Sequence, residues 1–450
     1  MQLDNFLLAK AQGPLSEYLS AMTELEPETV PLTSDVDTDV AIVGAGYTGL
    51  SAAIELAKKG HSVRVLEAHS IGWGASGRAW GQIAAFSKFM PAKVERDLGE
   101  AIAAKVNGAC AAGPDLVFSF IDRYQMRCSA YRTGNLVSAH TPAKEAELEA
   151  IARDLERRKL PVQLLDKAAT KAYIGSERYS VALFDPRGAS LNPLGYARGL
   201  GRAAISEGAV IHCRTPVRQL EKMMDGWRLR TPAGSVKASR VILATNAFNS
   251  DELFPGLGRA VLPVRAYQMI SEPLGKEALE IVLPGKQPLN DTRKLFSGVR
   301  LWPDGRLQVG VDGPPFAMDG EAMLSAVRRR ITMMFPILKD LRWEYSWGGW
   351  VDMTLDEYPR AYPLADGLWT GFGFSGRGIA MGTLLGRDLA RLAVGGSDLD
   401  TVLPISTLKP IWFHGIHRPL INCLVWKYRI EDYLNDVRYA RLGSQNLHPL

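Results

Sequence analysis

The strongest constraint on the fold is a glycine-rich turn that joins a strand-like segment to a helix-like segment. A second strand-like segment follows the helix. Val40–Val43 form a continuous apolar run, which is typical of a buried parallel strand. Gly44, Gly46 and Gly49 follow it, and the next residues have the apolar spacing of a helix. A second strand-like run then ends at Glu67. This β–α–β order is the context in which a GxGxxG pattern binds a dinucleotide.

Each residue of this pattern has a physical role. Gly44 permits the tight turn, Gly46 lets the backbone approach a pyrophosphate, and Gly49 lets helix and strand pack closely. The open N–H groups at the helix N-terminus favour phosphate. Glu67 follows at the distance where a carboxylate accepts hydrogen bonds from ribose hydroxyls, which disfavours NADP. The motif alone leaves NAD and FAD open.

A second glycine-rich helix start favours FAD. Gly371, Gly373, Gly376 and Gly378 lead from a short apolar run into a leucine-rich helical segment near the other end of the sequence. A reduced flavin carries negative charge near N1 and the C2 carbonyl, which a helix N-terminus stabilises. Glycines let that backbone approach the ring. A nicotinamide enzyme would not need this second turn.

A third segment, "GWGASGRAWGQ" at residues 72–82, combines four glycines with two tryptophans. We expect its backbone to run past the cofactor and Trp80 to lie beside it. Residues 261–351 contain short strand-like runs and one amphipathic helix, which predicts a mostly antiparallel sheet facing the substrate. The expected organisation is a lead-in at 1–34, an FAD-binding domain at 35–120, 175–260 and 355–400, a substrate domain at 121–174 and 261–354, and a C-terminal tail at 401–450.

Five segments carry a resemblance to a known family. They are "DVAIVGAGYTGLSAAIELAKKGHSVRVLEA", "GWGASGR", "LNPLGYARGLGRAA", "WGGWVDMTLDEYPR" and "GFSGRG". Together they resemble the D-amino acid oxidase superfamily of FAD-dependent oxidoreductases and, within it, the gamma-glutamylputrescine oxidoreductase group. The resemblance implies an α/β fold, with a Rossmann-like FAD-binding domain of the glutathione-reductase type and a mostly antiparallel β-sheet substrate domain with helices.

The resemblance also implies which residues hold the cofactor. The expected FAD-binding residues are Gly44, Gly46, Tyr47, Thr48, Gly49, Glu67, Ala68, Gly74, Ala75, Ser76, Gly77, Arg78, Val217, Thr245, Gly373, Gly376, Arg377, Gly378 and Ile379. Some relatives attach the flavin to a cysteine ahead of the late glycine turn. The segment "WGGWVDMTLDEYPR" has no cysteine, so we expect FAD to be bound non-covalently.

Four positions depart from the family pattern. Ala79 and Trp80 stand where the family usually has Asn-Gly. Arg377 replaces a histidine, and three roles stay open for it: stabilising reduced flavin, binding an acidic substrate group, or lying at the surface. Gln308 aligns with a lysine that activates oxygen in some relatives, which argues against a fast reaction with oxygen.

The resemblance implies oxidation of a CH–NH bond by hydride transfer to flavin N5, followed by hydrolysis of the imine. Two alternatives remain: a dehydrogenase that passes electrons to a quinone or carrier protein, and a non-catalytic flavin-binding module. Aromatic faces can hold an amine. Catalytic candidates are Trp80, Trp347, Arg377 and Gln308, and the expected substrate pocket is Arg265, Tyr267, Trp347 and Trp350.

Composition argues against several other classes of protein. The net charge is only +5, from 53 basic and 48 acidic residues, without a basic block that would indicate nucleic acid. The four cysteines lack metal-ligand spacing, so we expect no metal and a reducing, cytoplasmic compartment. No run reaches the roughly 18 apolar residues of a membrane span. Residues 411–434 mix aromatic, apolar and basic side chains. They suit a membrane surface, but we expect them to pack back on their own domain.

Overall fold

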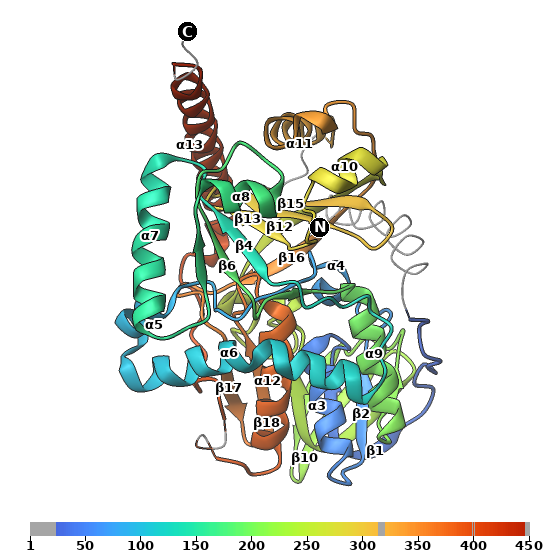
Figure 1. The fold of residues 1–450 in the computed structure, drawn as a ribbon. Coiled ribbons are helices and arrows are strands. Elements are labelled where there is room, and N and C mark those ends of the chain that lie inside the picture. The colour runs from blue at the N-terminus through green and yellow to red at the C-terminus, as the bar shows by residue number, and fades with distance from the viewer. Residues whose placement is uncertain (1–23, 314–319, 398, 400, 446–450) are drawn as a thin grey trace.

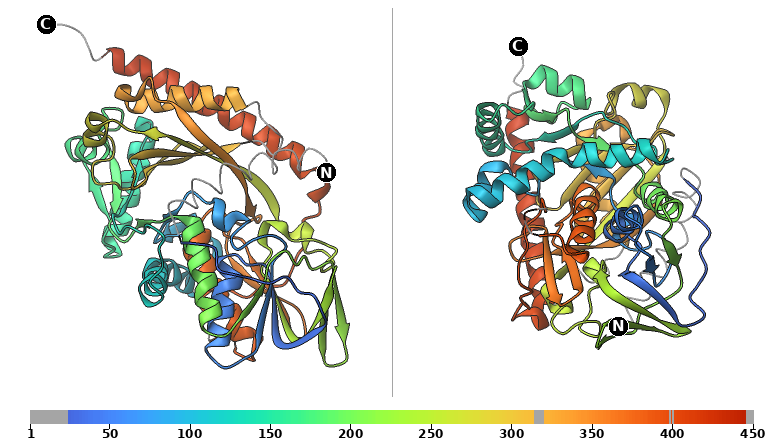
Figure 2. Two further views of the ribbon diagram at one scale, coloured as in Figure 1. Left: turned by 90° about the vertical axis from the view of Figure 1, so that its right-hand side faces the viewer. Right: turned by 90° about the horizontal axis from the view of Figure 1, so that it is seen from below.

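The computed structural model describes residues 24–313, 320–397, 399 and 401–445 (Figure 1). Within these residues, two eight-stranded sheets lie one above the other, and helices cover both (Figure 2). No helix in this part of the chain is long and apolar enough to cross a membrane.

The first sheet has a parallel core. Its strand order is β17-β18-β11-β1-β2-β8, and the four pairs from β18 to β8 are parallel. A β9–β10 hairpin continues from β11. The strands are β1 (Val36–Val43), β2 (Val63–Leu66), β8 (Val210–His212), β9 (Gln219–Met223), β10 (Gly226–Thr231), β11 (Gly234–Leu243), β17 (Arg360–Ala365) and β18 (Leu368–Phe372).

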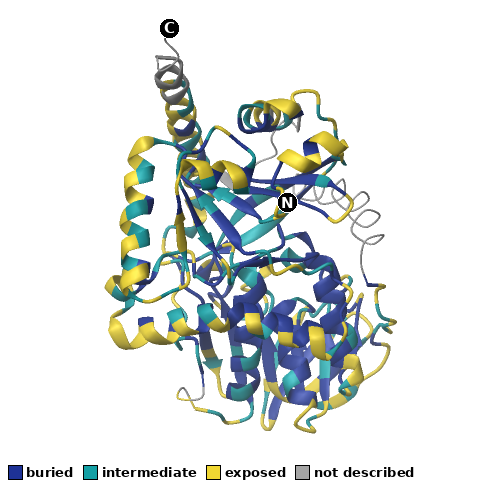
Figure 3. Ribbon diagram, in the orientation of Figure 1, coloured by how far each residue is buried: buried dark blue, intermediate teal, exposed yellow. Residues whose placement is uncertain are grey.

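The second half of β1, Val40–Val43, is apolar without alternation because both of its faces are covered. Val40 and Ile42 belong to the hydrophobic cluster beneath the helices. Ala41 and Val43 belong to a second cluster on the opposite face, which includes residues of β10. The covering helices are α3 (Tyr47–Ala57), α6 (Glu100–Arg123), α9 (Pro193–Ser206) and α12 (Gly378–Ala393). In Figure 3, α3, α9 and α12 are mostly buried, whereas α6 carries exposed residues along its outer side.

The second sheet is mostly antiparallel, with the strand order β16-β12-β15-β14-β13-β4-β6-β5; only β13 and β4 pair in parallel. Its strands are β4 (Asn135–Ser138), β5 (Gln163–Leu165), β6 (Ala182–Asp185), β12 (Leu262–Pro273), β13 (Leu289–Asp291), β14 (Phe296–Leu301), β15 (Arg306–Gly313) and β16 (Trp343–Met353). Helices α11 (Gly320–Met334) and α13 (His417–Gln445) lie over its outer face (Figure 2). The two sheets confirm the predicted fold class.

Shorter elements complete the described chain. They are α4 (Ala75–Arg78), α5 (Pro91–Leu98), α7 (Pro142–Arg157), α8 (Lys167–Ile174), α10 (Lys276–Ile281), the two-stranded sheet of β3 (Gln82–Ile83) with β7 (Ala189–Ser190), and 3-10 turns at Asn246–Phe248, Gly258–Ala260, Pro336–Leu338 and His414–Ile416.

One predicted domain boundary is wrong. The sequence placed residues from 175 onward with the FAD-binding part, but β6 at Ala182–Asp185 pairs with β4 and β5 in the second sheet. The chain therefore stays with the second sheet until after Asp185. The cause is a short strand whose pairing partners lie far away in sequence, which local patterns do not show.

The two ends of the described chain are ordered by contacts with the sheets. The residues 1–23 of the expected lead-in lie outside the described residues. Glu24 is buried and forms an ion pair with Arg202. At the other end, the expected tail is largely the long helix α13. Its Asp432 and Asp436 face the second sheet and are paired with arginines there, so this segment packs back on its own domain.

Candidate cofactor and substrate site

The first glycine turn has the geometry that its sequence pattern requires. Gly44 has a φ of +107°, and a Cβ there would lie 2.8 Å from the Ala244 carbonyl oxygen. A Cβ at Gly49 would lie 2.0 Å from the Gly44 carbonyl oxygen. Only glycine therefore permits this sharp turn and this close contact between strand and helix.

The N-terminus of α3 is open toward the segment "GASGR". The N-cap residues of α3 and α12, Gly46 and Arg377, form no side-chain cap, whereas the N-cap residues of α7, α8 and α9 do. The Ser76 hydroxyl accepts a hydrogen bond from the Tyr47 amide at 3.1 Å. The Tyr47 hydroxyl donates to the Ser76 and Pro193 carbonyls. These contacts bring α4, with Ala75 and Gly77, to a helix terminus suited to a pyrophosphate.

Glu67 is fixed at the end of β2 by backbone donors. Its two carboxylate oxygens accept from the amides of Ala45 at 2.8 Å and His69 at 2.9 Å. Burial raises the pKa of Glu67, and these hydrogen bonds oppose that rise. Ala68 follows it directly, and Val217 lies beyond β8, the strand next to β2. The carboxylate is thus fixed just after β2, and its role toward a ribose stays a prediction.

The segment after β11 lies against the residue that begins the "GASGR" segment. The Thr245 hydroxyl donates to the Asn249 side-chain oxygen at 2.5 Å within the turn that follows this strand. A Cβ at Gly74 would lie 3.2 Å from the Phe248 ring. Thr245 and Gly74, which are distant in sequence, therefore border one site.

The late glycine turn is held by a residue that sequence reasoning missed, Asp352. Its Oδ2 accepts from the amides of Gly373 at 2.5 Å and Phe374 at 2.7 Å. Asp352 is 2% exposed, and burial raises its pKa to about 6 despite these hydrogen bonds. Gly373 and Gly376 have φ values of +102° and +88°. The only sequence signal was an acidic residue near the end of a strand that is rich in aromatic residues.

Thr48, Gly378 and Ile379 lie where α3 and α12 come together. Gly378 and Ile379 open α12. A Cβ at Gly382, one turn later, would lie 3.2 Å from the Thr48 hydroxyl oxygen. Both glycine turns thus end in helices that pack against each other, so the two predicted ends of the cofactor site belong to one unit.

Arg78 links the two sheets. Its Nε donates to the Trp73 carbonyl at 2.8 Å, and its own carbonyl accepts from Trp347 Nε1 at 3.1 Å. A Cβ at Gly349 would lie 3.3 Å from the Arg78 Cβ. Burial, together with the charge of Arg265, lowers the pKa of Arg78 to about 10. Its backbone borders the predicted flavin site, while its guanidinium is held at the junction with β16.

The face of the second sheet that points toward α4 and α9 is called the inner face here. Its buried members include Gln268, Ile270, Arg300, Gln308 and Trp347. Trp347 and Ile270 pack with Leu194 of α9 and with Trp302. Arg300 Nη1 donates to the Leu191 carbonyl at 2.8 Å. The inner face therefore forms the wall opposite the cofactor-binding elements.

Gln308 lies at the centre of a buried hydrogen-bond network. Its Oε1 accepts from Arg300 Nε at 2.8 Å and from Trp302 Nε1 at 2.9 Å. Its Nε2 donates to Gln268 Oε1 at 2.9 Å. The position that aligns with an oxygen-activating lysine thus holds a neutral amide, and the positive charge belongs to Arg300 beside it.

Trp80 packs against this wall. It is 9% exposed, and a Cβ at Gly298 would lie 2.6 Å from the Cη2 of its ring. Its Nε1 is buried and has no hydrogen-bond partner among the described residues. The Trp80 ring thus contacts β14 of the second sheet.

The expected pocket of Arg265, Tyr267, Trp347 and Trp350 is not brought together. Arg265 pairs with Trp350 and Gln268 pairs with Trp347 across β12 and β16. Alternate residues of a strand point to opposite faces. Trp347 therefore lies on the inner face, while the other three lie on the outer face, where Arg265 sits over the Tyr267 and Trp350 rings. The expectation of one pocket is wrong because positions 347 and 350 are an odd number of residues apart, so their side chains point to opposite faces of the sheet.

Arg377 is partly buried and its Nη1 donates to Gln82 Oε1 at 3.1 Å. Burial lowers its pKa. It precedes α12 and thus joins the late glycine turn to the end of "GWGASGRAWGQ". Because of this contact, a position free in solvent at the surface is the least supported of the three roles left open for Arg377.

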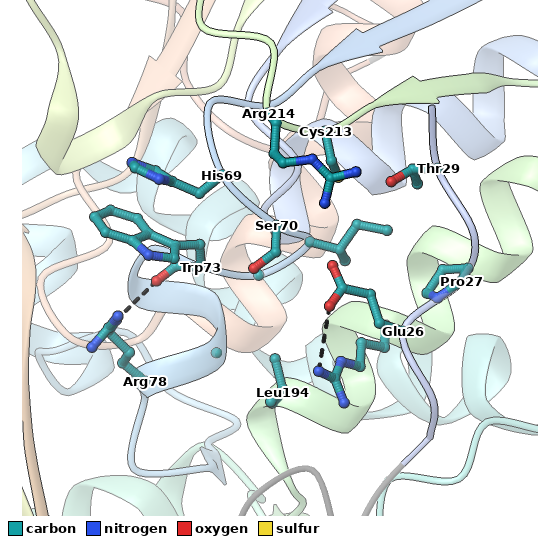
Figure 4. Close-up of a pocket in the computed structure, with 14 residues that line it drawn as sticks. Glu26, Pro27, Thr29, His69, Ser70, Trp73, Arg78, Leu194, Cys213 and Arg214 are labelled. Carbon is teal, nitrogen blue, oxygen red and sulfur yellow. Dashed lines mark hydrogen bonds and ion pairs between the residues drawn. The ribbon is translucent and has the colours of Figure 1, made fainter. Parts of the chain in front are cut away.

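A cavity of about 550 Å³ lies on the other side of the "GASGR" segment (Figure 4). It is lined in part by Trp73, Arg78, Arg198 and Arg214. Trp73 stacks on His69 with ring centroids 3.8 Å apart. Of the predicted cofactor residues, the cavity touches only Gly77 and Arg78, so the glycine turns rather than this cavity define the cofactor site.

The chain's residues fit a bound FAD. The N-termini of α3 and α12, whose own N-cap residues form no side-chain cap, lie in one site, and the Ala45 amide fixes Glu67 at the position where we predict a ribose. The Ser375 hydroxyl and the Trp80 indole nitrogen are buried without a partner among the described residues. Glycines let the backbone of both turns approach a ligand. These are the groups that an elongated dinucleotide with a polar ring would engage.

Comparison with known sequences shows similarity along most of the chain. A family model described as DAO, FAD dependent oxidoreductase, matches residues 39–392. The chain is 31% identical over 385 residues to gamma-glutamylputrescine oxidoreductase of Escherichia coli strain K12, which covers 85% of this chain and 90% of that protein. It is 31% identical over 374 residues to the probable oxidoreductase OrdL of Haemophilus influenzae, covering 82% and 85%.

Solved structures show the same fold. Glycine oxidase from Geobacillus kaustophilus superposes with a TM-score of 0.69 at 23% identity, covering 80% of this chain and 95% of that one. L-proline dehydrogenase from P. horikoshii gives 0.67 at 19% identity, covering 82% and 96%. At these identities the likeness concerns the fold, and it agrees with the resemblance drawn from the five sequence segments.

Proposed function

Because the chain belongs to the DAO family of FAD-dependent oxidoreductases, we propose that it oxidises a CH–NH bond of an amine. The relative of Escherichia coli carries the name gamma-glutamylputrescine oxidoreductase, which makes gamma-glutamylated amines the first substrate class to test. FAD is the cofactor of the family, and the fit of both glycine turns supports its presence in this chain.

The inner face is the observation that carries this proposal. Trp80, Trp302 and Trp347 supply aromatic surface, and Gln268 and Gln308 supply neutral amides, all buried opposite the cofactor-binding elements. Aromatic faces attract an amine cation and also accept its alkyl chain. Amide groups orient a polar substrate without adding charge. This wall suits an elongated amine with a polar end.

The chain's residues position the reaction. Backbone amides at the starts of α3 and α12 and the Glu67 carboxylate would hold the cofactor. The buried tryptophans would exclude water and orient the donor carbon. Bound FAD would supply the hydride acceptor at N5, a role that no side chain of the protein can take. The substrate nitrogen must be neutral, and the resulting imine is hydrolysed by water.

A second candidate is a dehydrogenase that passes electrons to a quinone or carrier protein. The buried amide of Gln308, at the position that aligns with an oxygen-activating lysine, supports it. A positive charge near the flavin stabilises the anionic species formed when oxygen is reduced. Arg300 supplies charge nearby, but it is already bonded to Gln308 and Leu191.

The substrate class is tested by anaerobic reduction of the purified flavoprotein. Gamma-glutamylated amines, polyamines, sarcosine and D-amino acids are each added, and absorbance near the flavin band is followed. We expect bleaching by at least one amine and its slowing in Trp347→Ala. Flavin that no amine or amino acid reduces would contradict the proposal and would favour a non-catalytic flavin-binding module.

The electron acceptor is tested separately with the amine that bleaches the flavin. Peroxide yield is measured with oxygen alone and compared with the rate in the presence of a soluble quinone. An oxidase gives one peroxide per imine at full rate. Slow reoxidation by oxygen and fast reoxidation by quinone would select the dehydrogenase.

A further inference from the structure

Helix α13 turns two aspartates toward its own domain and most of its large apolar side chains outward. Asp432 is 3% exposed and Asp436 is nearly buried, and both face arginines of the second sheet and α11. A surface helix normally turns its apolar face inward. The exposed apolar residues, each 44–59% exposed, are Ile416 just before the helix and Leu420, Leu424, Trp426, Ile430, Tyr433 and Leu434 within it.

The outward residues follow the spacing of a helix–helix seam. Leu420, Cys423, Lys427, Ile430 and Leu434 are separated by alternating steps of three and four residues. This is the a/d heptad pattern of paired helices. We call these five residues the outer stripe.

The opposite side of the helix fixes the direction of the outer stripe. Val425 and Asp432 occupy the heptad position that lies farthest from an a/d seam, and they are 5% and 3% exposed against the second sheet. Trp426 and Tyr433 widen the seam on one side. The outer stripe therefore lies on the side of the helix opposite the buried Val425 and Asp432.

The charge of the outward face distinguishes between a membrane and a second copy of the protein as the partner of the outer stripe. Between Leu420 and Leu434, the outward face carries Lys427 and Glu431, whose charged atoms are 3.7 Å apart. These two charges cancel, whereas binding to an anionic membrane requires an excess of Lys and Arg. Arg429, whose guanidinium lies 5.3 Å from the Trp426 ring, is the remaining basic group beside this stretch. An antiparallel second copy of α13 would place Lys427 of each helix beside Glu431 of the other. A parallel copy would instead bring the two Lys427 side chains together.

The available area matches a stable pairing. Seven large apolar side chains, each about half exposed, offer on the order of 100 Å² apiece. Together with Lys427 and Glu431, this approaches the ~800 Å² that each partner contributes to a standard interface. A single lysine at an a position is a known means of setting register in such pairs.

We propose that the outer stripe is the dimer interface of this protein, on which a second copy packs its own α13 in the antiparallel direction. In this register Lys427 lies opposite Ile430 of the second copy, and Cys423 lies opposite Leu434. The inference is independent of the substrate proposed above.

The oligomeric state of the full-length flavoprotein tests it. Light scattering after gel filtration and analytical ultracentrifugation at micromolar concentration are expected to give twice the mass of one chain. The double variant Leu420→Glu with Ile430→Glu is expected to be a monomer, with the dissociation constant raised at least about a hundredfold because charges would be buried at the seam. Its flavin content is expected to stay unchanged, which shows that it folds.

Two further variants sharpen the test. Met224→Glu changes a fully exposed apolar residue at the tip of the β9–β10 hairpin and is expected to remain a dimer. Leu434→Cys is expected to form a disulfide-linked dimer with Cys423 of the second copy under mild oxidation. A linked dimer of the unchanged protein through its exposed Cys423 would show a parallel pair and contradict the proposed geometry.

Two other outcomes overturn the proposal. The first is an unchanged protein that stays monomeric at micromolar concentration. The second is a monomer that sediments with vesicles of anionic phospholipid and is released by the Leu420→Glu, Ile430→Glu variant, because the outer stripe would then be a membrane contact.

Discussion

At the scale of single residues, two carboxylates hold the two glycine turns in place. Glu67 accepts from an amide of the first turn and Asp352 accepts from two amides of the late turn. Asp352 is buried and Glu67 is partly buried, and burial raises the pKa of both. A hydrogen bond from a backbone amide to a charged acceptor is stronger than one between neutral groups. Each carboxylate thus gives a turn without regular secondary structure one fixed conformation.

Removing the first carboxylate should weaken FAD binding. Glu67→Ala loses the acceptor for the Ala45 amide and the predicted acceptor for the ribose, and we expect the dissociation constant of FAD to rise roughly tenfold to a hundredfold. Flavin fluorescence during titration of the apoprotein measures it. Glu28→Ala, at an exposed position, is the matched control. Equal affinities in the two variants would contradict a cofactor role for Glu67.

The second carboxylate should make stability depend on pH. Asp352 has a pKa of about 6 in the folded protein and an ordinary value of 3.8, so the unfolded chain releases this proton first as pH rises. The carboxyl is neutral in both states below about pH 4, and its ionisation then destabilises the fold up to about pH 6.

Relative to Asp352→Asn, the free energy of unfolding of the unchanged protein should therefore fall by about 2–3 kcal/mol between pH 4 and 6 and then stay level. Urea unfolding of both proteins at a series of pH values measures the difference. Asp388, whose pKa is also raised to about 6 by burial, titrates in both proteins and cancels. A difference that is constant across this range would be inconsistent with the raised pKa.

At the scale of elements, α3 and α12 form the frame of the cofactor site. They begin at the two glycine turns and pack against each other in the core of the first sheet. A Cβ at Gly386 of α12 would lie 2.3 Å from the Thr48 carbonyl oxygen and 2.8 Å from the Ser51 Cβ. The close approach of these helices sets the distance between the two turns.

Two helical glycines give opposite predictions. Gly386→Ala should destabilise the protein by about 1–3 kcal/mol, because its methyl group meets the backbone of α3. Gly108 of α6 has no atom within 4 Å of an added Cβ, so Gly108→Ala should stabilise by up to about 1 kcal/mol through helix propensity. Chemical unfolding of the flavoprotein measures both. Shifts of the same sign would argue against this packing of α3 on α12.

At the scale of the whole molecule, the inner face lies over the cofactor-binding elements and α13 braces the outer face. Trp347 and Arg300 reach across to Arg78 and Leu191. The start of α13 is anchored where His414 contacts the Val261 carbonyl at 3.0 Å. The helix thus runs over the back of the same sheet whose front forms the expected substrate wall.

The packing of α13 on its domain should depend on the negative charge of Asp436. Asp436 accepts from Arg293 at 2.5 Å and from Arg178 at 3.2 Å, and Arg293 is almost completely buried. Asp436→Asn should cost about 3 kcal/mol, because two arginines lose a charged partner away from solvent. Thermal or urea unfolding measures it, with the exposed Asp340→Asn as control. Equal stability of the two variants would show that these ion pairs do not anchor the helix.

The sequence by itself determined the cofactor class and the fold class. The strand, the glycines, the helix and Glu67 lie within one continuous segment, so local spacing reports their chemistry. It also placed the antiparallel second sheet, because turns and strand-like runs are local features.

Only the tertiary structure decided which side chains share a surface. Trp347 and Trp350 are three residues apart, and strand pairing sends them to opposite faces. Asp352 holds amides 21 and 22 residues away, and β6 pairs with strands beyond several intervening elements. In α13 the heptad spacing is visible in the sequence, but the ion pairs of Asp432 and Asp436 decide that its apolar side points outward. Such choices depend on contacts between distant segments, which no local pattern encodes.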